Sequence, residues 1–122
     1  MTLRAARCAF TVAIAALITH ALSLGYEIAL AEGMDRITAK DPTTDHKKNS
    51  NHEIGLAQDC DLYQDGLYLM DTKDHERLGA FWEEYGVEHG LPLVWGGNFP
   101  PHADGTSGAD GNHYSLRWQG RS

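Results

Sequence analysis

Two short polar segments that lie far apart in the sequence constrain the fold most strongly. The first contains His52 and, seven positions later, Asp59; the second contains His113, with Asp110 three residues before it. Two imidazoles and one carboxylate make a three-ligand zinc set that leaves a fourth coordination position for water, as in catalytic zinc sites. Asp110 is suited to handle a proton on that water. A fold that uses this set must bring residue 113 next to residues 52 and 59.

The spacing of His52 and Asp59 requires a bend in the chain between them. Positions seven apart in a regular strand point to opposite faces, so both cannot share a metal from one strand. Gly55 allows a bend or a bulge that leaves His52 on the incoming loop and Asp59 in the strand. Small residues at Gly55 and Ala57 also suit a backbone that passes close to a metal. The alternative is a surface histidine followed by an unrelated strand aspartate.

Other residues near the second segment compete for the same roles. His102 and Asp104 lie in the same loop as Asp110, between Pro101 and Gly105, and we expect them to be exposed to solvent. A purely turn-forming role is the alternative for Asp110. The remaining histidines have no ligand-like context and are expected at surface or helix positions: His20, His46, His75 and His89.

Length and composition limit the class of protein. The 122 residues, 42% hydrophobic and 22% charged, predict one globular domain over residues 1–122, with long loops at 33–49 and 98–111. A formal net charge of −7 argues against nucleic-acid binding. The two cysteines are too few for a disulfide scaffold, and Cys60 is expected to be a buried apolar residue, with a role as a zinc ligand as the alternative.

The order of expected elements indicates an α+β fold. Hydrophobic periodicity predicts a helix over 2–24, strands over 26–30, 55–62 and 67–70, and a helix over 75–85. A break follows at 86–92, and strands are expected at 93–95 and 113–118. This arrangement predicts a small antiparallel sheet with helices packed on it.

The N-terminus allows two interpretations. Arg4 and Arg7 precede an apolar run, and Ala29-Leu30-Ala31 resembles a signal-peptidase site, so a secretory signal is one alternative. The apolar run spans only residues 8–18, which is too short to cross a bilayer, and no stable membrane insertion is expected. We favour a core helix whose buried stripe consists of Ile14, Leu17, Ile18 and Leu22.

Several segments together resemble one family, the zinc peptidoglycan peptidases. This family includes D-alanyl-D-alanine carboxypeptidases and phage L-alanyl-D-glutamate endolysins. The matching segments are SLGYEIAL, SNHEIGLAQDCDLYQDGLYL, FWEEYG, WGGNF and DGNHYSL, and the resemblance extends over roughly residues 10–117. The resemblance is to short single-domain phage and prophage members, and it implies the Hedgehog/D-Ala-D-Ala-peptidase-like fold with the first helix inside the mature domain.

The resemblance also implies roles for individual residues. It makes His52, Asp59 and His113 the ligands of Zn²⁺ and Asp110 the catalytic base. It assigns substrate binding to Ser50 and to Arg36, although Asp35 stands where the family has tyrosine before this arginine. The loop 100–109 is longer than the corresponding connection in short members, which would reshape access to the site.

The function expected on this basis is hydrolysis of a peptide bond in the peptidoglycan stem. An L-Ala–D-Glu endopeptidase is favoured, with a D-Ala-D-Ala carboxypeptidase as the alternative bond specificity. A non-catalytic phage structural or wall-binding relative is the alternative class. The expected partner is the stem peptide, without nucleic acid, and the chain is expected to be a monomer made in the cytoplasm that acts on the bacterial cell wall.

Overall fold

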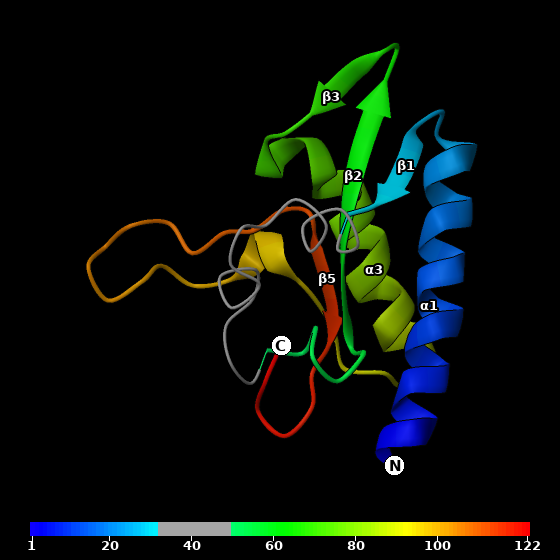
Figure 1. The fold of residues 1–122 in the computed structure, drawn as a ribbon, viewed down its shortest axis with the longest axis vertical. Coiled ribbons are helices and arrows are strands. Elements are labelled where there is room, and N and C mark those ends of the chain that lie inside the picture. The colour runs from blue at the N-terminus through cyan, green and yellow to red at the C-terminus, as the bar shows by residue number, and fades with distance from the viewer. Residues whose placement is uncertain (32–49) are drawn as a thin grey trace.

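The computed structural model describes residues 1–31 and 50–122, and these form an α+β fold around one antiparallel sheet (Figure 1). Arg36 and the rest of the predicted loop 33–49 lie outside the described residues. The described elements are α1 (Leu3–Ser23), β1 (Glu27–Leu30), β2 (Ala57–Gln64), β3 (Leu67–Leu69), the 3₁₀ helix η2 (Thr72–His75), α3 (Glu76–His89), β4 (Leu93–Trp95), the 3₁₀ helix η3 (Gly96–Asn98) and β5 (His113–Leu116). The small antiparallel sheet and the two helices of the sequence prediction are confirmed.

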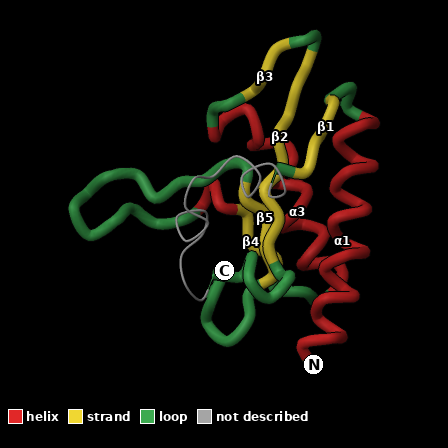
Figure 2. Tube along the Cα trace, viewed as in Figure 1, coloured by secondary structure: helices red, strands yellow, loops and turns green. Residues whose placement is uncertain are grey.

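The sheet is organised around β2, its longest strand. The strand order is β1-β2-β5-β4, and β3 pairs with the end of β2 in a hairpin. The first residues of β2 pair with β5, while its later residues pair with β1 on the opposite edge. The helices α1 and α3 cover one face of this sheet, and the loop between η3 and β5 projects away from the body of the molecule (Figures 1 and 2).

Helix α1 packs into the core through one face that combines alanines with two larger apolar residues. Its buried positions are Ala6, Phe10, Ala13, Leu17 and Ala21, which recur at helical spacing on one face. The predicted stripe was therefore right for Leu17 but wrong for Leu22, whose relative exposure is 58%. Ile14 and Ile18 are half-buried. Small side chains on the inner face allow the helix backbone to approach its neighbours closely.

Helix α1 has a capped first turn and a glycine just after its last turn. The Thr2 side chain accepts a hydrogen bond from the Ala5 amide at 3.1 Å, and the chain leaves the helix at Gly25 with a φ of +88°. By length and composition α1 could also cross a membrane, a property that core helices and signal sequences share.

Helix α3 extends to His89, into the predicted break at 86–92. Gly86 lies inside the helix because the chain that follows packs directly on it: a Cβ there would lie 2.7 Å from the Leu91 carbonyl oxygen. The helix ends instead at Gly90, which has a left-handed φ of +65°. Composition alone does not distinguish a glycine that allows close packing, such as Gly86, from one that ends a helix, such as Gly90.

The core lies between the two helices and the sheet. Trp82 of α3 is fully buried and donates its indole N–H to the backbone oxygens of Val94 and Ser115, at 3.1 Å each. These bonds attach α3 to the paired strands β4 and β5. Cys60 is also fully buried, as predicted.

Candidate metal centre

Strand pairing brings the two polar segments together. In the antiparallel ladder between β2 and β5, Asp59 lies directly opposite His113. Directly opposed residues project to the same face of a sheet, with Cβ atoms about 5 Å apart. The register of two strands therefore delivers the carboxylate and one imidazole to a common point.

A turn before β2 supplies the second imidazole. The Glu53 amide donates to the Ser50 carbonyl oxygen at 3.1 Å, and the Gly55 amide donates to that of His52 at 3.4 Å. Gly55 adopts a φ of +74°, a left-handed conformation that favours glycine, and β2 begins two residues later at Ala57. The predicted bend at Gly55 is confirmed, and it directs His52 back over the start of the strand.

The three side chains converge with the spacing of metal ligands. His52 Nε2 lies 3.1 Å from His113 Nδ1 and 3.5 Å from Asp59 Oδ1, and the last two atoms are 3.4 Å apart. Ligand atoms at 2.0–2.2 Å from a tetrahedral zinc ion are separated by roughly 3.4 Å. The triangle of these three possible ligand atoms thus has the size that a zinc ion requires.

The balance of donors and acceptors also fits a cation. The side chains are largely buried, with relative exposures of 5% for His52 and 14% for Asp59, and Asp59 Oδ1 has no hydrogen-bond partner. Unprotonated imidazole nitrogens and a carboxylate oxygen can all serve as metal ligands. A bound cation would satisfy all three atoms at once. Among the described residues, His52, Asp59 and His113 form a buried group that could hold a metal ion.

Asp110 is placed beside this group by glycines. The Asp110 amide donates to the Gly96 carbonyl oxygen at 2.9 Å, and the His113 amide donates to that of Asp110 at 3.1 Å. A Cβ on Gly96 would lie 2.2 Å from the Asp110 carbonyl oxygen, so only glycine permits this approach. The indole of Trp95 donates to the Gly111 carbonyl oxygen at 2.7 Å and fixes the same turn.

The electrostatic environment of Asp110 links it to the group. Partial desolvation raises the pKa of its carboxyl although the residue is exposed, and the negative charge of Asp59 raises that pKa further. Interactions with His113 and His52 act in the opposite direction. A carboxyl with a raised pKa close to candidate metal ligands is a candidate for proton transfer.

The two residues that compete with Asp110, His102 and Asp104, lie on the surface of the same loop. His102 and Asp104 are exposed, as predicted. The Asp104 carboxylate accepts hydrogen bonds from the Thr106 amide at 3.0 Å and from the Thr106 hydroxyl at 2.6 Å, and these bonds lower the pKa of Asp104. The loop that carries both residues extends away from the sheet (Figure 1).

Ser50 has a local structural contact. Its hydroxyl accepts a hydrogen bond from the His52 amide at 3.2 Å and so supports the turn that holds this imidazole. Its predicted contact with substrate stays a prediction, as does that of Arg36.

Sequence reasoning missed two neighbours of the group and the burial of one histidine. Asn51, a residue of the turn that carries His52, is fully buried, and the Phe99 ring lies 5.2 Å from that of His113, measured between centroids. His75 lies at a helix position, the last residue of η2, which was one of the two expected alternatives, but it is buried with a relative exposure of 2%. Its Nδ1 lies 2.9 Å from the Tyr114 hydroxyl, a tertiary contact that the local sequence does not reveal.

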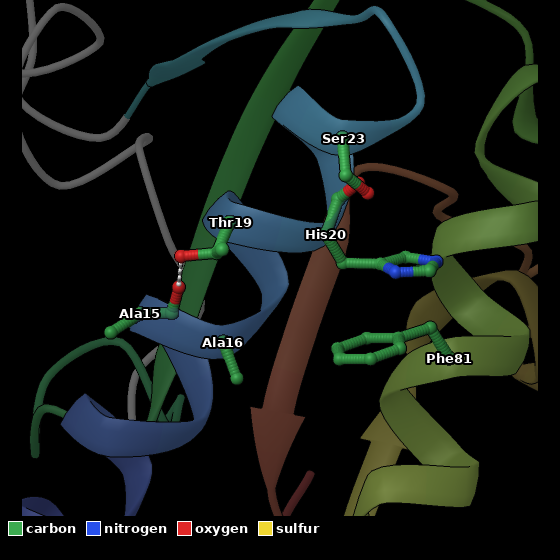
Figure 3. Close-up of a pocket in the computed structure, with 6 residues that line it drawn as sticks. All are labelled: Ala15, Ala16, Thr19, His20, Ser23 and Phe81. Atoms are coloured by element: carbon green, nitrogen blue, oxygen red, sulfur yellow. Dashed lines mark hydrogen bonds between the residues drawn. The ribbon is translucent and has the colours of Figure 1, made fainter.

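The described residues also line an apolar groove between α1 and α3, shown in Figure 3. Its lining includes Ala15 and Ala16, and the rings of His20 and Phe81 stack in it with centroids 4.1 Å apart. The groove is formed by the two helices and contains none of the metal-group residues. It is therefore separate from the candidate metal centre.

No protein-family model and no curated protein matches the chain.

Proposed function

We propose that this protein is a zinc-dependent peptidase that hydrolyses a peptide bond in the stem of peptidoglycan. The observation that carries the proposal is the triangle of His52 Nε2, Asp59 Oδ1 and His113 Nδ1, with edges of 3.1–3.5 Å. Two imidazoles and one carboxylate suit Zn²⁺ and leave a coordination position for water or substrate. Asp110 beside the triangle supplies a proton-transfer group.

The ligand set and the acid have separate roles in this proposal. When bound, zinc supplies Lewis acidity toward the scissile carbonyl and the attacking water. The Asp110 carboxylate accepts the proton of the attacking water and then donates it to the departing amine. The raised pKa of Asp110 favours the first transfer, because a carboxylate with a higher pKa is a stronger base. Arg36 would stabilise the developing charge on the carbonyl oxygen.

The stem-peptide substrate comes from the sequence resemblance. The favoured bond is that between L-Ala and D-Glu, and cleavage between the terminal D-Ala residues is the alternative. We further propose that the chain acts as a monomer on the bacterial cell wall after synthesis in the cytoplasm. A non-catalytic wall-binding relative would keep the metal group but would release no fragments.

Mass spectrometry of fragments released from purified peptidoglycan tests the proposal. We expect new N-terminal D-Glu and C-terminal L-Ala ends, and we expect this release to require zinc and Asp110. Free D-alanine as the released product would instead identify a carboxypeptidase. Zinc binding without any released product would identify the non-catalytic alternative.

A further inference from the structure

The turn that carries His52 is tied to the end of the chain by one buried side chain. Asn51 has a relative exposure of 0%, and its Nδ2 donates hydrogen bonds to the carbonyl oxygens of Leu116 at 2.8 Å and Arg121 at 2.9 Å. The backbone carbonyl oxygen of Asn51 in turn accepts a hydrogen bond from the Leu56 amide at 2.9 Å. This residue thus connects the metal-ligand turn to β5 and to the C-terminal residues at the same time.

The C-terminal residues form a tight turn that presents the Arg121 carbonyl. Trp118 and Arg121 exchange two backbone hydrogen bonds, of 2.8 and 2.9 Å. Between them Gln119 has a φ of +49° and Gly120 a φ of +78°. Positive φ at both central positions is characteristic of a type I′ turn, which closes a two-residue hairpin. The residues 118–121 are called the C-terminal hairpin below.

The chemistry of the asparagine matches its two acceptors. A primary amide offers two N–H donors on one nitrogen, whereas aspartate of the same shape would place acceptors against two backbone carbonyls. Asn51 Oδ1 is buried without a hydrogen-bond partner, which costs free energy. The side chain therefore fits this position through its donors, which hold the turn and the hairpin together.

We propose that Asn51 is a positioning residue, and that the C-terminal hairpin acts through it to set how tightly the metal group, His52, Asp59 and His113, binds zinc. The inference rests on the proposed zinc site. His52 follows Asn51 directly in the chain. Loss of the two hydrogen bonds from the Asn51 side chain therefore frees the turn that orients the His52 ring. His113 and Asp59 stay in place because the pairing of β2 with β5 holds them independently. Loss of the hairpin contact should therefore weaken metal binding by displacing one ligand of three.

Zinc affinity, measured by competition with a chromophoric chelator at a temperature where every variant is folded, tests this inference. Asn51→Asp and Asn51→Ala should each bind zinc about tenfold or more weakly, the scale seen when partners of metal ligands are removed. Gly120→Val should also weaken binding, because a β-branched residue is strained at a φ of +78°. Gln119→Asn is the matched control: asparagine tolerates positive φ, so the hairpin and the affinity should persist.

A second control separates positioning from general stability. Leu17→Ala creates a cavity under α1, away from the metal group, and should lower the melting temperature while zinc affinity stays within about twofold. Cobalt provides a readout of ligand geometry: the visible d–d bands of Co²⁺-loaded Asn51→Asp should differ from those of the wild type, and those of Leu17→Ala should not.

The outcomes distinguish two failures. Wild-type affinity and cobalt spectra in the Asn51 variants, or equal weakening in Leu17→Ala, would overturn the positioning role while leaving the zinc site intact. A wild-type chain that binds no zinc would overturn the proposed function, and this inference with it.

Discussion

The two faces of the sheet each bury a histidine, and the comparison shows which kind of burial indicates a metal. His113 and Tyr114 are adjacent in β5 and therefore point to opposite faces. On the metal face, His113 meets His52 and Asp59. On the helix-covered face, Tyr114 meets His75. Burial is similar, but the chemistry of the partners differs.

The helix-covered pair is complete without an ion. The Tyr114 hydroxyl and His75 Nδ1 form one hydrogen bond of 2.9 Å, and a T-shaped contact with Trp82 packs the phenol ring. Burial lowers the pKa of His75 and raises that of Tyr114, so both groups are neutral around pH 7. On the metal face, by contrast, three side-chain atoms that can each bind a metal converge, and Asp59 Oδ1 has no hydrogen-bond partner. This convergence of possible ligands, rather than the presence of a buried histidine, identifies the candidate site.

The largest expected effect is the loss of a ligand on the metal face. His52→Ala and His113→Ala should lose most bound zinc and all peptidase activity, because two remaining ligands hold the ion weakly. His75→Gln is the matched control on the other face and should keep one zinc per chain. Zinc content after dialysis, measured by inductively coupled plasma mass spectrometry, checks both. Full zinc in either alanine variant would refute the ligand assignment.

On the helix-covered face, a charged substitution in α1 should destabilise the fold only where the substituted side chain is buried. Leu17→Asp should prevent stable folding, because it buries an unpaired carboxylate at a position with 0% exposure. Leu22→Asp should be tolerated, since this side chain is 58% exposed. Circular dichroism melting curves measure the difference. Equal damage from both substitutions would mean that the two faces of α1 are not distinguished in the way described.

Asp110→Asn separates chemistry from binding on the metal face. The variant should retain zinc, while kcat falls on the order of a hundredfold or more through loss of acid–base help. Release of fragments from peptidoglycan, measured at saturating zinc, reports the change. A rate near that of the wild type would show that another group transfers the proton.

A smaller effect is expected for Tyr114→Phe. The substitution removes the buried bond to His75 and should lower the free energy of unfolding by roughly 1–2 kcal/mol, with zinc content unchanged. Urea denaturation of the zinc-free protein gives the value. A loss of zinc equal to that of His113→Ala would mean that the two faces are coupled and would break the comparison.

The smallest effect concerns pH. The folded-state pKa of His75 is lower than the unfolded value of 6.5, so the unfolded chain binds more protons below that pH. The stabilising contribution of neutral His75 is therefore complete above pH 6.5 and is lost as pH falls toward the folded-state pKa. Denaturation of the zinc-free protein between pH 7.5 and 5 should show this loss, and His75→Gln should reduce it. An identical pH dependence in both proteins would contradict it.

The sequence predicted the features that depend on local pattern. Strand β4 at Leu93–Trp95 was located fully, and the bend at Gly55 followed from the incompatible spacing of His52 and Asp59. The convergence of His113 on these residues was predicted from chemistry and resemblance, and the β2–β5 register accounts for it.

The features that sequence reasoning missed depend on tertiary contacts. The buried stripe of α1 runs through alanines such as Ala13, because close packing selects small side chains where periodicity alone favours Ile and Leu. The roles of Asn51 and His75 depend on partners 65 and 39 residues away, respectively, in the sequence. No local pattern encodes such separations.

The central claim is that His52, Asp59 and His113 bind zinc, and anomalous diffraction tests it most directly. Crystals of the chain grown with one equivalent of Zn²⁺ should show a single strong anomalous peak at the zinc absorption edge, between His52 Nε2, Asp59 Oδ1 and His113 Nδ1. The three bond lengths should be about 2.0–2.2 Å. A peak elsewhere, or His52 and His113 joined by a direct hydrogen bond with no peak between them, would contradict the account.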